Sequence, residues 1–254
     1  MIADTAVPVD GFAATSATRR ASAFKSIFIV ASGNFLEMFD FMVFGYYATY
    51  ISKAFFPTGS EFGSLLLTLM TFGAGFLMRP LGALVLGAYV DRHGRRKGLL
   101  LVLGLMALGT LAIAITPTYE QIGLAAPLII LAGRLVQGLS AGVEVGGVSV
   151  YLNEIAPPNR KGFFTSWQSA SQQAAVVFAA LIGLIVSTSL DTATMEAWGW
   201  RVPFIIGCIM IPFLFIIRSH VEETDAFLSR KEHPKVGQIL RIIGANWDWC
   251  CKAR

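Results

Sequence analysis

The chain has 254 residues, of which 55% are hydrophobic and 14% are charged, with a formal net charge of +4. An average soluble domain is about 25% charged and about 45–50% apolar, so this composition excludes an ordinary soluble protein and indicates several membrane crossings. The small net charge gives no sign of nucleic-acid binding. The three cysteines form neither a CxxC pair nor a cluster with histidine, so the sequence predicts neither a metal site nor a disulfide framework.

Six apolar runs are each long enough to cross a bilayer, which takes about 20 residues in a helix. They cover residues 24–51, 62–90, 98–116, 122–151, 163–190 and 200–217. The sequence therefore predicts an all-α membrane protein with a six-helix bundle over residues 24–218. The small and polar residues 1–23 are expected to form a disordered tail, and the mixed-charge residues 219–254 a second tail or loop.

Lysine and arginine are distributed unevenly between the two sides of the predicted bundle. Sixteen lie in the N-terminal tail and at the very start of the first span, in the connections after the second and fourth spans, and from Arg218 to the end of the chain. The opposite side carries two, Lys53 and Arg201. Because cytoplasmic loops of membrane proteins are enriched in Lys and Arg, both termini are expected to be cytoplasmic.

Ionisable residues inside a span are costly and therefore mark candidate functional sites. The first span carries Asn34, Glu37 and Asp40, which are spaced three apart and lie near one face of a helix. A carboxyl group in that position either binds a cation or is protonated, so Glu37 and Asp40 are candidates for carrying protons. The alternative is a structural contact with a neighbouring helix, or a position near the membrane surface.

Two arginines also lie inside predicted spans. Arg79 is in the second span, and Arg134 shares a stripe of the fourth span with Gln137 and Glu144. Arginine does not lose its proton in proteins, so each needs an anionic partner or an aqueous cavity. An arginine beside an amide suits a carboxylate ligand, and Glu144 is a third candidate for proton coupling. For Arg79 the alternative is a buried ion pair with a carboxylate of the first span.

Small and polar residues form two further patterns. Glycines repeat every four residues at 138, 142 and 146, which favours close packing of the fourth span against another helix. The fifth span begins with a polar stripe that includes Gln168, Ser169 and Gln172. Such a stripe either lines a polar cavity or makes hydrogen bonds between helices, and both interpretations stay open.

Several stretches carry a family resemblance. GAYVDRHGRRK at 87–97 resembles the Gly-x-x-x-Asp-Arg-x-Gly-Arg-Arg motif that follows the second helix in the major facilitator superfamily. RLVQGLSAGVEVGG at 134–147 and NEIAPPNRKG at 153–162 resemble that superfamily's motifs in helix four and in the following loop. Longer stretches, such as SGNFLEMFDFMVFGYYATYISKAFFP and WGWRVPFIIGC, resemble the metabolite:proton symporter family. Within it they resemble the bacterial citrate–proton symporters most, with the tricarballylate symporters next.

The resemblance implies a secondary transporter of the bacterial inner membrane, not an enzyme, that needs no cofactor. It would move a tricarboxylate such as citrate together with protons by rocking two six-helix bundles, each built from two inverted three-helix repeats. Substrate binding would then fall to Arg134, Arg79, Gln137, Asn34, Gln168, Ser169 and Gln172, and proton coupling to Glu37, Asp40 and Glu144. The cytoplasmic gate would comprise Gly87, Asp91, Arg92, Gly94, Arg95 and Arg96.

One departure from the family pattern bears on function. The family has twelve spans, whereas the sequence predicts six and ends where a seventh is expected. This favours a truncated or frameshifted product, or a half that works with a missing C-terminal six-helix bundle or a second copy. A transport-inactive membrane fragment therefore stays open as an alternative to citrate symport. So does symport of another organic acid, such as tricarballylate or a dicarboxylate, or of a zwitterionic osmolyte.

Overall fold

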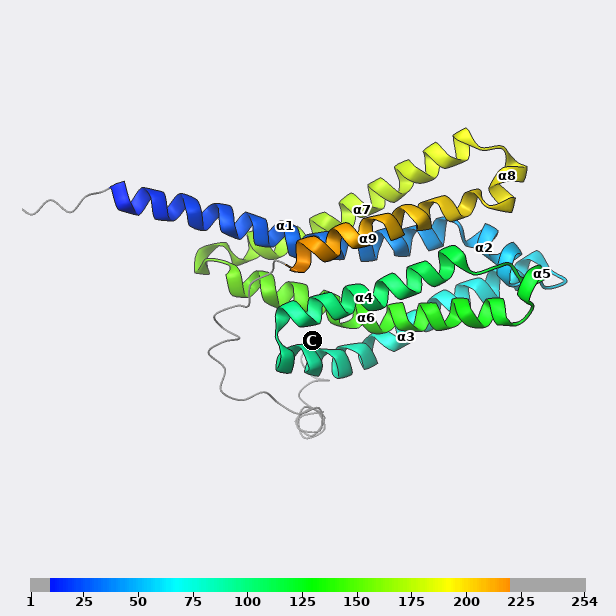
Figure 1. Ribbon diagram of the computed structural model, residues 1–254, viewed down its shortest axis with the longest axis horizontal. Coiled ribbons are helices and arrows are strands. Elements are labelled where there is room, and N and C mark those ends of the chain that lie inside the picture. The colour runs from blue at the N-terminus through cyan, green and yellow to red at the C-terminus, as the bar shows by residue number, and fades with distance from the viewer. Residues whose placement is uncertain (1–9, 220–254) are drawn as a thin grey trace, which may run out of the picture.

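The computed structural model describes residues 10–219, and its long helices run side by side along one axis (Figure 1). The long helices are α1 (Asp10–Tyr46), α3 (Glu61–His93), α4 (Arg95–Ile115), α6 (Ala125–Ile155), α7 (Lys161–Ser189) and α9 (Val202–Ser219). Within the described range, six segments are long and apolar enough to cross a membrane. The predicted all-α architecture with six spanning helices is confirmed.

Successive long helices run in opposite directions. Three short helices, α2 (Ala48–Phe55), α5 (Tyr119–Ile122) and α8 (Thr192–Ala197), follow α1, α4 and α7 at one end of the bundle (Figure 1). The 3-10 turn η1 (Pro158–Arg160) lies between α6 and α7, and η2 (Gly199–Arg201) precedes α9. In the bundle α3 packs on α6, α4 packs on α6 and α9, and α1 packs on α7 and α9.

Helix α1 differs from the predicted first span at both ends. The backbone of residues 10–23 is helical, where the sequence predicts a disordered tail; this stretch is rich in alanine and free of proline, which favours a helix. At its other end α1 stops at Tyr46, because Tyr47 has φ −101° and ψ 13°, and the chain continues as α2. Residues 1–9 and the predicted C-terminal tail, residues 220–254, lie outside the described part of the chain.

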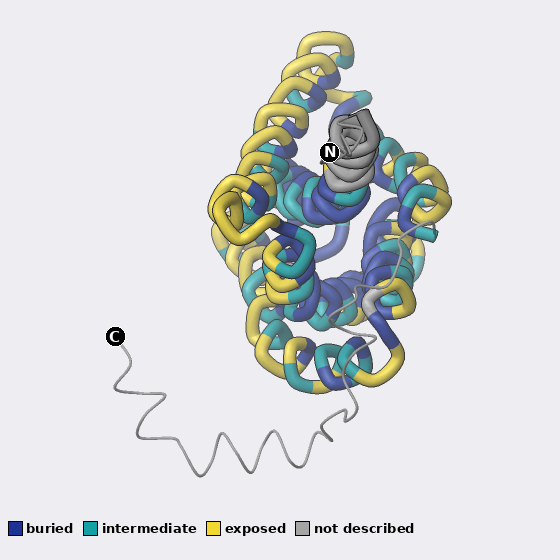
Figure 2. The backbone as a smooth tube through the Cα atoms, turned by 90° about the vertical axis from the view of Figure 1, so that its left-hand side faces the viewer, coloured by how far each residue is buried: buried dark blue, intermediate teal, exposed yellow. Residues whose placement is uncertain are grey.

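Buried residues line the interior of the bundle and exposed residues cover its outside (Figure 2). In α1, 61% of the spanning segment is buried, against 17% in both α3 and α7, so α1 is central and the other two are peripheral. The outward faces carry large apolar side chains such as Met70, Leu77, Leu184 and Phe213. Hydrocarbon is a suitable solvent for such faces, as expected of a membrane bundle.

The glycines of α6 bring its backbone directly against α3. A Cβ on Gly138 would overlap the carbonyl of Gly75, and one on Gly142 would overlap the carbonyl of Arg79. A Cβ on Gly146, in contrast, would have nothing within 4 Å. Two glycines of the predicted repeat therefore make the close contact, and they set the separation of the helices that carry Arg79 and Arg134.

Candidate functional site

Helix α1 directs its three polar residues toward three different helices. Asn34 contacts α7, Glu37 contacts α3, and Asp40 contacts α4 and α6. In an α-helix with 3.6 residues per turn, a step of three residues turns the side chain by about 60°. Asn34 and Asp40 are therefore about 120° apart on the helix, which is enough to give them separate partners.

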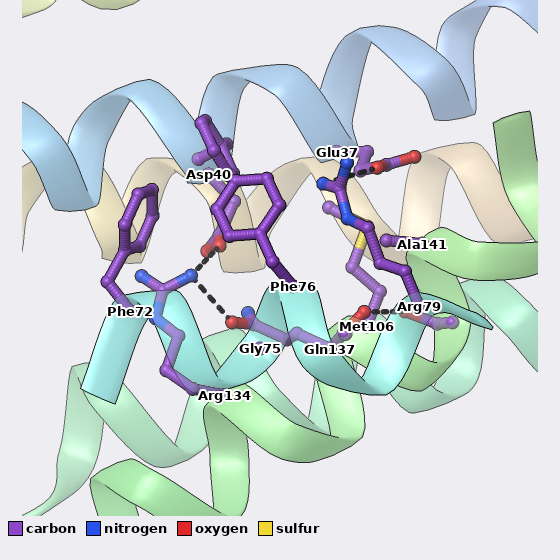
Figure 3. Close-up of a pocket in the computed structure, with 13 residues that line it drawn as sticks. Glu37, Asp40, Phe72, Gly75, Phe76, Arg79, Met106, Arg134, Gln137 and Ala141 are labelled. Carbon is purple, nitrogen blue, oxygen red and sulfur yellow. Dashed lines mark hydrogen bonds and ion pairs between the residues drawn. The ribbon is translucent and has the colours of Figure 1, made fainter. Parts of the chain in front are cut away.

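Asp40 lies in a closed network of four buried side chains. Its carboxylate accepts hydrogen bonds from the Arg134 guanidinium (Nη1 to Oδ2, 2.9 Å) and from the Thr110 hydroxyl (2.9 Å to Oδ1). Arg134 Nη1 also donates to Gln137 Oε1 (2.8 Å), and Gln137 Nε2 donates to the Thr110 hydroxyl (3.0 Å). Each buried polar group thereby supports the next, which holds the Arg134–Asp40 pair in one geometry. Figure 3 shows the part of the network in which Arg134 contacts Asp40 and Gln137.

The Arg134 guanidinium is only partly satisfied by this network. Its Nε and Nη2 are buried and have no hydrogen-bond partner among the described residues. The face of the guanidinium lies 3.7 Å from the centroid of the Phe44 ring, which fixes its plane. The free edge of Arg134 is therefore a preformed donor pair of the kind that binds a carboxylate with two parallel hydrogen bonds.

A second ion pair lies beside the first along α1. Arg79 Nη2 on α3 is 3.4 Å from Glu37 Oε1, and Glu37 Oε2 is buried with no hydrogen-bond partner. The guanidinium also lies 4.5 Å from the centroid of the Phe76 ring and 5.6 Å from that of Phe41. About a third (32%) of the Arg79 side chain is exposed, against 5% for Arg134, so this pair is the more accessible of the two.

Two cavities meet at the Glu37–Arg79 pair. One, of about 40 Å³, is lined by both ion pairs together with Gln137 and several aromatic residues. The other, of about 210 Å³, is lined by Glu37, Arg79 and Gln172, with Met38, Phe41 and Phe76. The smaller cavity has room for a few water molecules, and a larger ligand would reach the site from the second cavity.

The polar residues of α7 make hydrogen bonds with α1, and one of them lines the cavity of about 210 Å³. Asn34 donates to the Gln168 backbone carbonyl and to the Ser171 hydroxyl (2.9 Å each), and it accepts a hydrogen bond from Gln172 (3.2 Å). The Gln168 side chain accepts a hydrogen bond from Ser149 on α6. Ser169 is exposed. The polar stripe thus makes hydrogen bonds between helices, and of its members Gln172 also lines a cavity.

Glu144 does not join the Arg134 network despite sharing a helix with it. It forms an ion pair with Arg218 of α9, and both side chains are almost completely buried. Arg218 also donates to the backbone carbonyls of Leu99 and Val30, and it passes α1 at Gly33, where a Cβ would overlap the guanidinium. The sequence counts Arg218 with the charges that follow the sixth span, 200–217; the structure places it inside the bundle, because α9 continues to Ser219.

The expected gate residues lie where α3 turns into α4. Helix α3 continues to His93, so the expected loop reduces to Gly94, whose φ of 99° is in the region that favours glycine. Gly87, Asp91 and Arg92 belong to the end of α3, and Arg96 to the start of α4. The side chain of Arg95 lies outside the described part of the chain. The role of these residues as a gate stays a prediction.

Sequence reasoning missed two polar members of these clusters. Thr110 is a single hydroxyl inside an apolar run, and the signal that could have found it is the need of Asp40 for a second donor. Arg218 directly follows the predicted span 200–217, and hydropathy alone gives it no place inside the bundle. Among residues 10–219, no group of three or more His, Cys, Asp and Glu residues is placed to hold a metal ion.

Six apolar helices of alternating direction around buried carboxylate–guanidinium pairs give the fold of one six-helix bundle of the major facilitator superfamily. The chain belongs to the sugar (and other) transporter family, whose model matches residues 26–237. It is accordingly a multi-pass membrane protein and not an enzyme. These findings confirm the family and the fold that the sequence predicts.

Two curated relatives and one solved structure describe the similarity further. The chain is 60% identical over 233 residues to the citrate-proton symporter of Salmonella typhi, covering 92% of this chain and 54% of that protein. It is 54% identical over 232 residues to the citrate-proton symporter of Klebsiella pneumoniae, covering 91% and 52%. The proton:xylose symporter XylE bound to 6-bromo-6-deoxy-D-glucose aligns with a TM-score of 0.76 at 18% identity, covering 89% and 50%. The chain thus spans about half the length of these relatives.

Proposed function

We propose that this chain is the N-terminal half of a proton-coupled symporter that takes up citrate or a similar tricarboxylate. The observation that carries the proposal is the buried Arg134, which lines the cavity of about 40 Å³ and whose Nε and Nη2 have no hydrogen-bond partner among the described residues. A buried guanidinium edge without an acceptor is costly, and a substrate carboxylate would satisfy both donors. The 60% identity to a protein named as a citrate-proton symporter supports the same ligand class.

In this proposal the residues around the cavities divide into two roles. Arg134 and Arg79 bind substrate carboxylates, and Gln137 orients Arg134 through its hydrogen bond. Glu37 and Asp40, the acids that pair with these arginines, are the candidates for carrying the proton. Glu144 is paired with Arg218 away from both cavities named above, so we assign it to holding α6 and α9 together.

Transport also requires that a second bundle covers the accessible side of the site. Arg79 is partly exposed, and α3 and α7 leave most of their spanning residues uncovered. We propose that the second bundle is the other half of a twelve-helix transporter or a second copy of this chain. The basic connections after α3 and α6 would face the cytoplasm of a bacterial cell, with both termini on that side of the inner membrane.

Uptake of labelled citrate into vesicles tests the proposal. Vesicles would contain this chain alone, or this chain together with the C-terminal half of the Salmonella typhi relative, with and without an imposed proton gradient. We expect gradient-driven uptake when both halves are present, reduced by unlabelled citrate more than by a dicarboxylate or by betaine. Absence of uptake with both halves assembled would refute the proposal, and uptake by this chain alone would refute the need for another half.

A further inference from the structure

We propose that Glu37 and a substrate carboxylate compete for Arg79, and that the co-transported proton resides on Glu37 while Arg79 holds the substrate. This inference rests on the proposed function. It identifies which of the buried acids carries the proton that moves with the substrate. It follows from the different ways in which Glu37, Asp40 and Glu144 are held.

Asp40 and Glu144 are held more firmly than Glu37. Asp40 accepts hydrogen bonds on both oxygens, one from Arg134 and one from Thr110. Glu144 is paired through both oxygens with the fully buried Arg218. Glu37 makes a single contact of 3.4 Å with Arg79, and its Oε2 has no hydrogen-bond partner. Of these three acids, Glu37 has the partner that is easiest to replace.

Arg79 is positioned to change partners without moving. The rings of Phe76 and Phe41 contact its guanidinium independently of Glu37, and cation–π contacts of this kind hold the group in place. Arg79 lines both the cavity of about 210 Å³ and the cavity of about 40 Å³. A carboxylate in the larger cavity therefore reaches Arg79, and a pair with two parallel hydrogen bonds is stronger than the single long contact to Glu37.

The charges around Glu37 explain why exchange requires a proton. Asp40 on α1 and Glu144 on α6 are acids, and the two remaining cations, Arg134 on α6 and Arg218 on α9, are already paired with them. α7 presents the neutral Gln172 to this cavity. Once Arg79 pairs with substrate, an ionised Glu37 would be left inside the bundle without a cation, at high cost. One proton from the aqueous phase bound to Glu37 removes this unpaired charge, with no bond of the substrate made or broken.

Citrate binding to the purified full chain tests this exchange by calorimetry. Titrations in buffers of different ionisation enthalpy, at a pH where citrate is fully ionised, give the number of protons taken up per citrate. We expect about one proton for the wild type, so that its affinity falls about tenfold for each unit of rising pH. For Glu37→Gln we expect binding without proton uptake, an affinity that does not change with pH, and tighter binding than the wild type at high pH. Glu37→Asp should keep the proton uptake.

Glu196→Gln is the matched control, because it makes the same chemical change at an exposed site on α8, and it should bind like the wild type. A purely structural role for Glu37 would weaken binding at every pH, which overturns the exchange. Full proton uptake in Glu37→Gln with citrate still bound also overturns it and leaves the proposed function standing. Failure of every protein to bind citrate, also when assembled with the C-terminal half of the Salmonella typhi relative, would overturn both.

Discussion

Neutralising one partner of the Glu144–Arg218 pair should strongly destabilise the bundle. Glu144 is 2% exposed and Arg218 is completely buried, so Arg218→Gln leaves an acid inside the bundle with no cation. Breaking a buried pair in this way costs about 3–5 kcal/mol. Glu144→Gln should fall toward the lower end of that range, because the Leu99 and Val30 carbonyls still accept hydrogen bonds from Arg218.

The double variant separates a pairwise contact from two independent effects. When both charges are removed, no unpaired charge remains, so the combined loss should be smaller than the sum of the single losses by about 1–3 kcal/mol. For a chain of this size a loss of 1 kcal/mol lowers the unfolding temperature by about 2–4 °C, so the single variants should unfold about 6–20 °C earlier.

Tryptophan fluorescence during heating of the purified chain in detergent measures these shifts. Glu196→Gln serves as the control, because its pair with Lys53 is exposed on both sides and exposed pairs contribute little; its unfolding temperature should stay that of the wild type. If Glu144→Gln unfolds at the same temperature as Glu196→Gln, or if the losses of the two single variants add fully, the structural role of the pair is refuted.

Three further predictions concern packing, hydrogen bonding and pH. Gly138→Ala should cost about 1–3 kcal/mol because its Cβ meets backbone of α3, whereas Gly146→Ala, with open space around it, should be neutral or stabilising in the same thermal assay. Asn34→Ala should lower the free energy of unfolding by about 1–2 kcal/mol, because it loses its contacts with α7, including the Gln168 carbonyl. Citrate affinity measured by calorimetry should stay unchanged. A large loss of affinity would show that Asn34 binds the substrate. Hydrogen bonds from the Thr194 side chain and backbone lower the pKa of Asp191 below 3.8, so its contribution is present at neutral pH and is lost as the pH falls through that lowered pKa. The difference in unfolding temperature between the wild type and Asp191→Asn should therefore shrink in strong acid, and a constant difference would contradict the assignment.

The spanning helices could be predicted because they depend on local composition. A run of about 20 apolar residues has one favourable environment, the bilayer, whatever the rest of the chain does. The turn between α3 and α4 was also readable, since charged residues cannot stay in hydrocarbon and a glycine sits at the reversal. The ends of the helices could not be predicted as well. Hydropathy does not indicate that α1 begins at Asp10 or that α9 continues to Ser219.

The candidate site could be predicted as a set of residues but not as a set of pairs. Glu37, Asp40, Arg79 and Arg134 were all identifiable because each is an ionisable residue inside an apolar run. Which acid meets which arginine depends on the rotation and separation of four helices, and small shifts in either change the partners. Glu144 illustrates this: it shares a stripe with Arg134 on α6, yet its partner comes from α9.

The sequence by itself determined the membrane location, the six spans, the family and the charged residues that must find partners inside the bundle. It could do so because hydropathy and short motifs are properties of neighbouring residues. Only the tertiary structure decided that Asp40 is enclosed with Arg134 and Thr110, that Glu144 is paired with Arg218, and that Glu37 is left weakly held beside a cavity. Those outcomes depend on how α1, α3, α4, α6 and α9 pack, and close backbone contact at glycines sets the separation of α3 and α6.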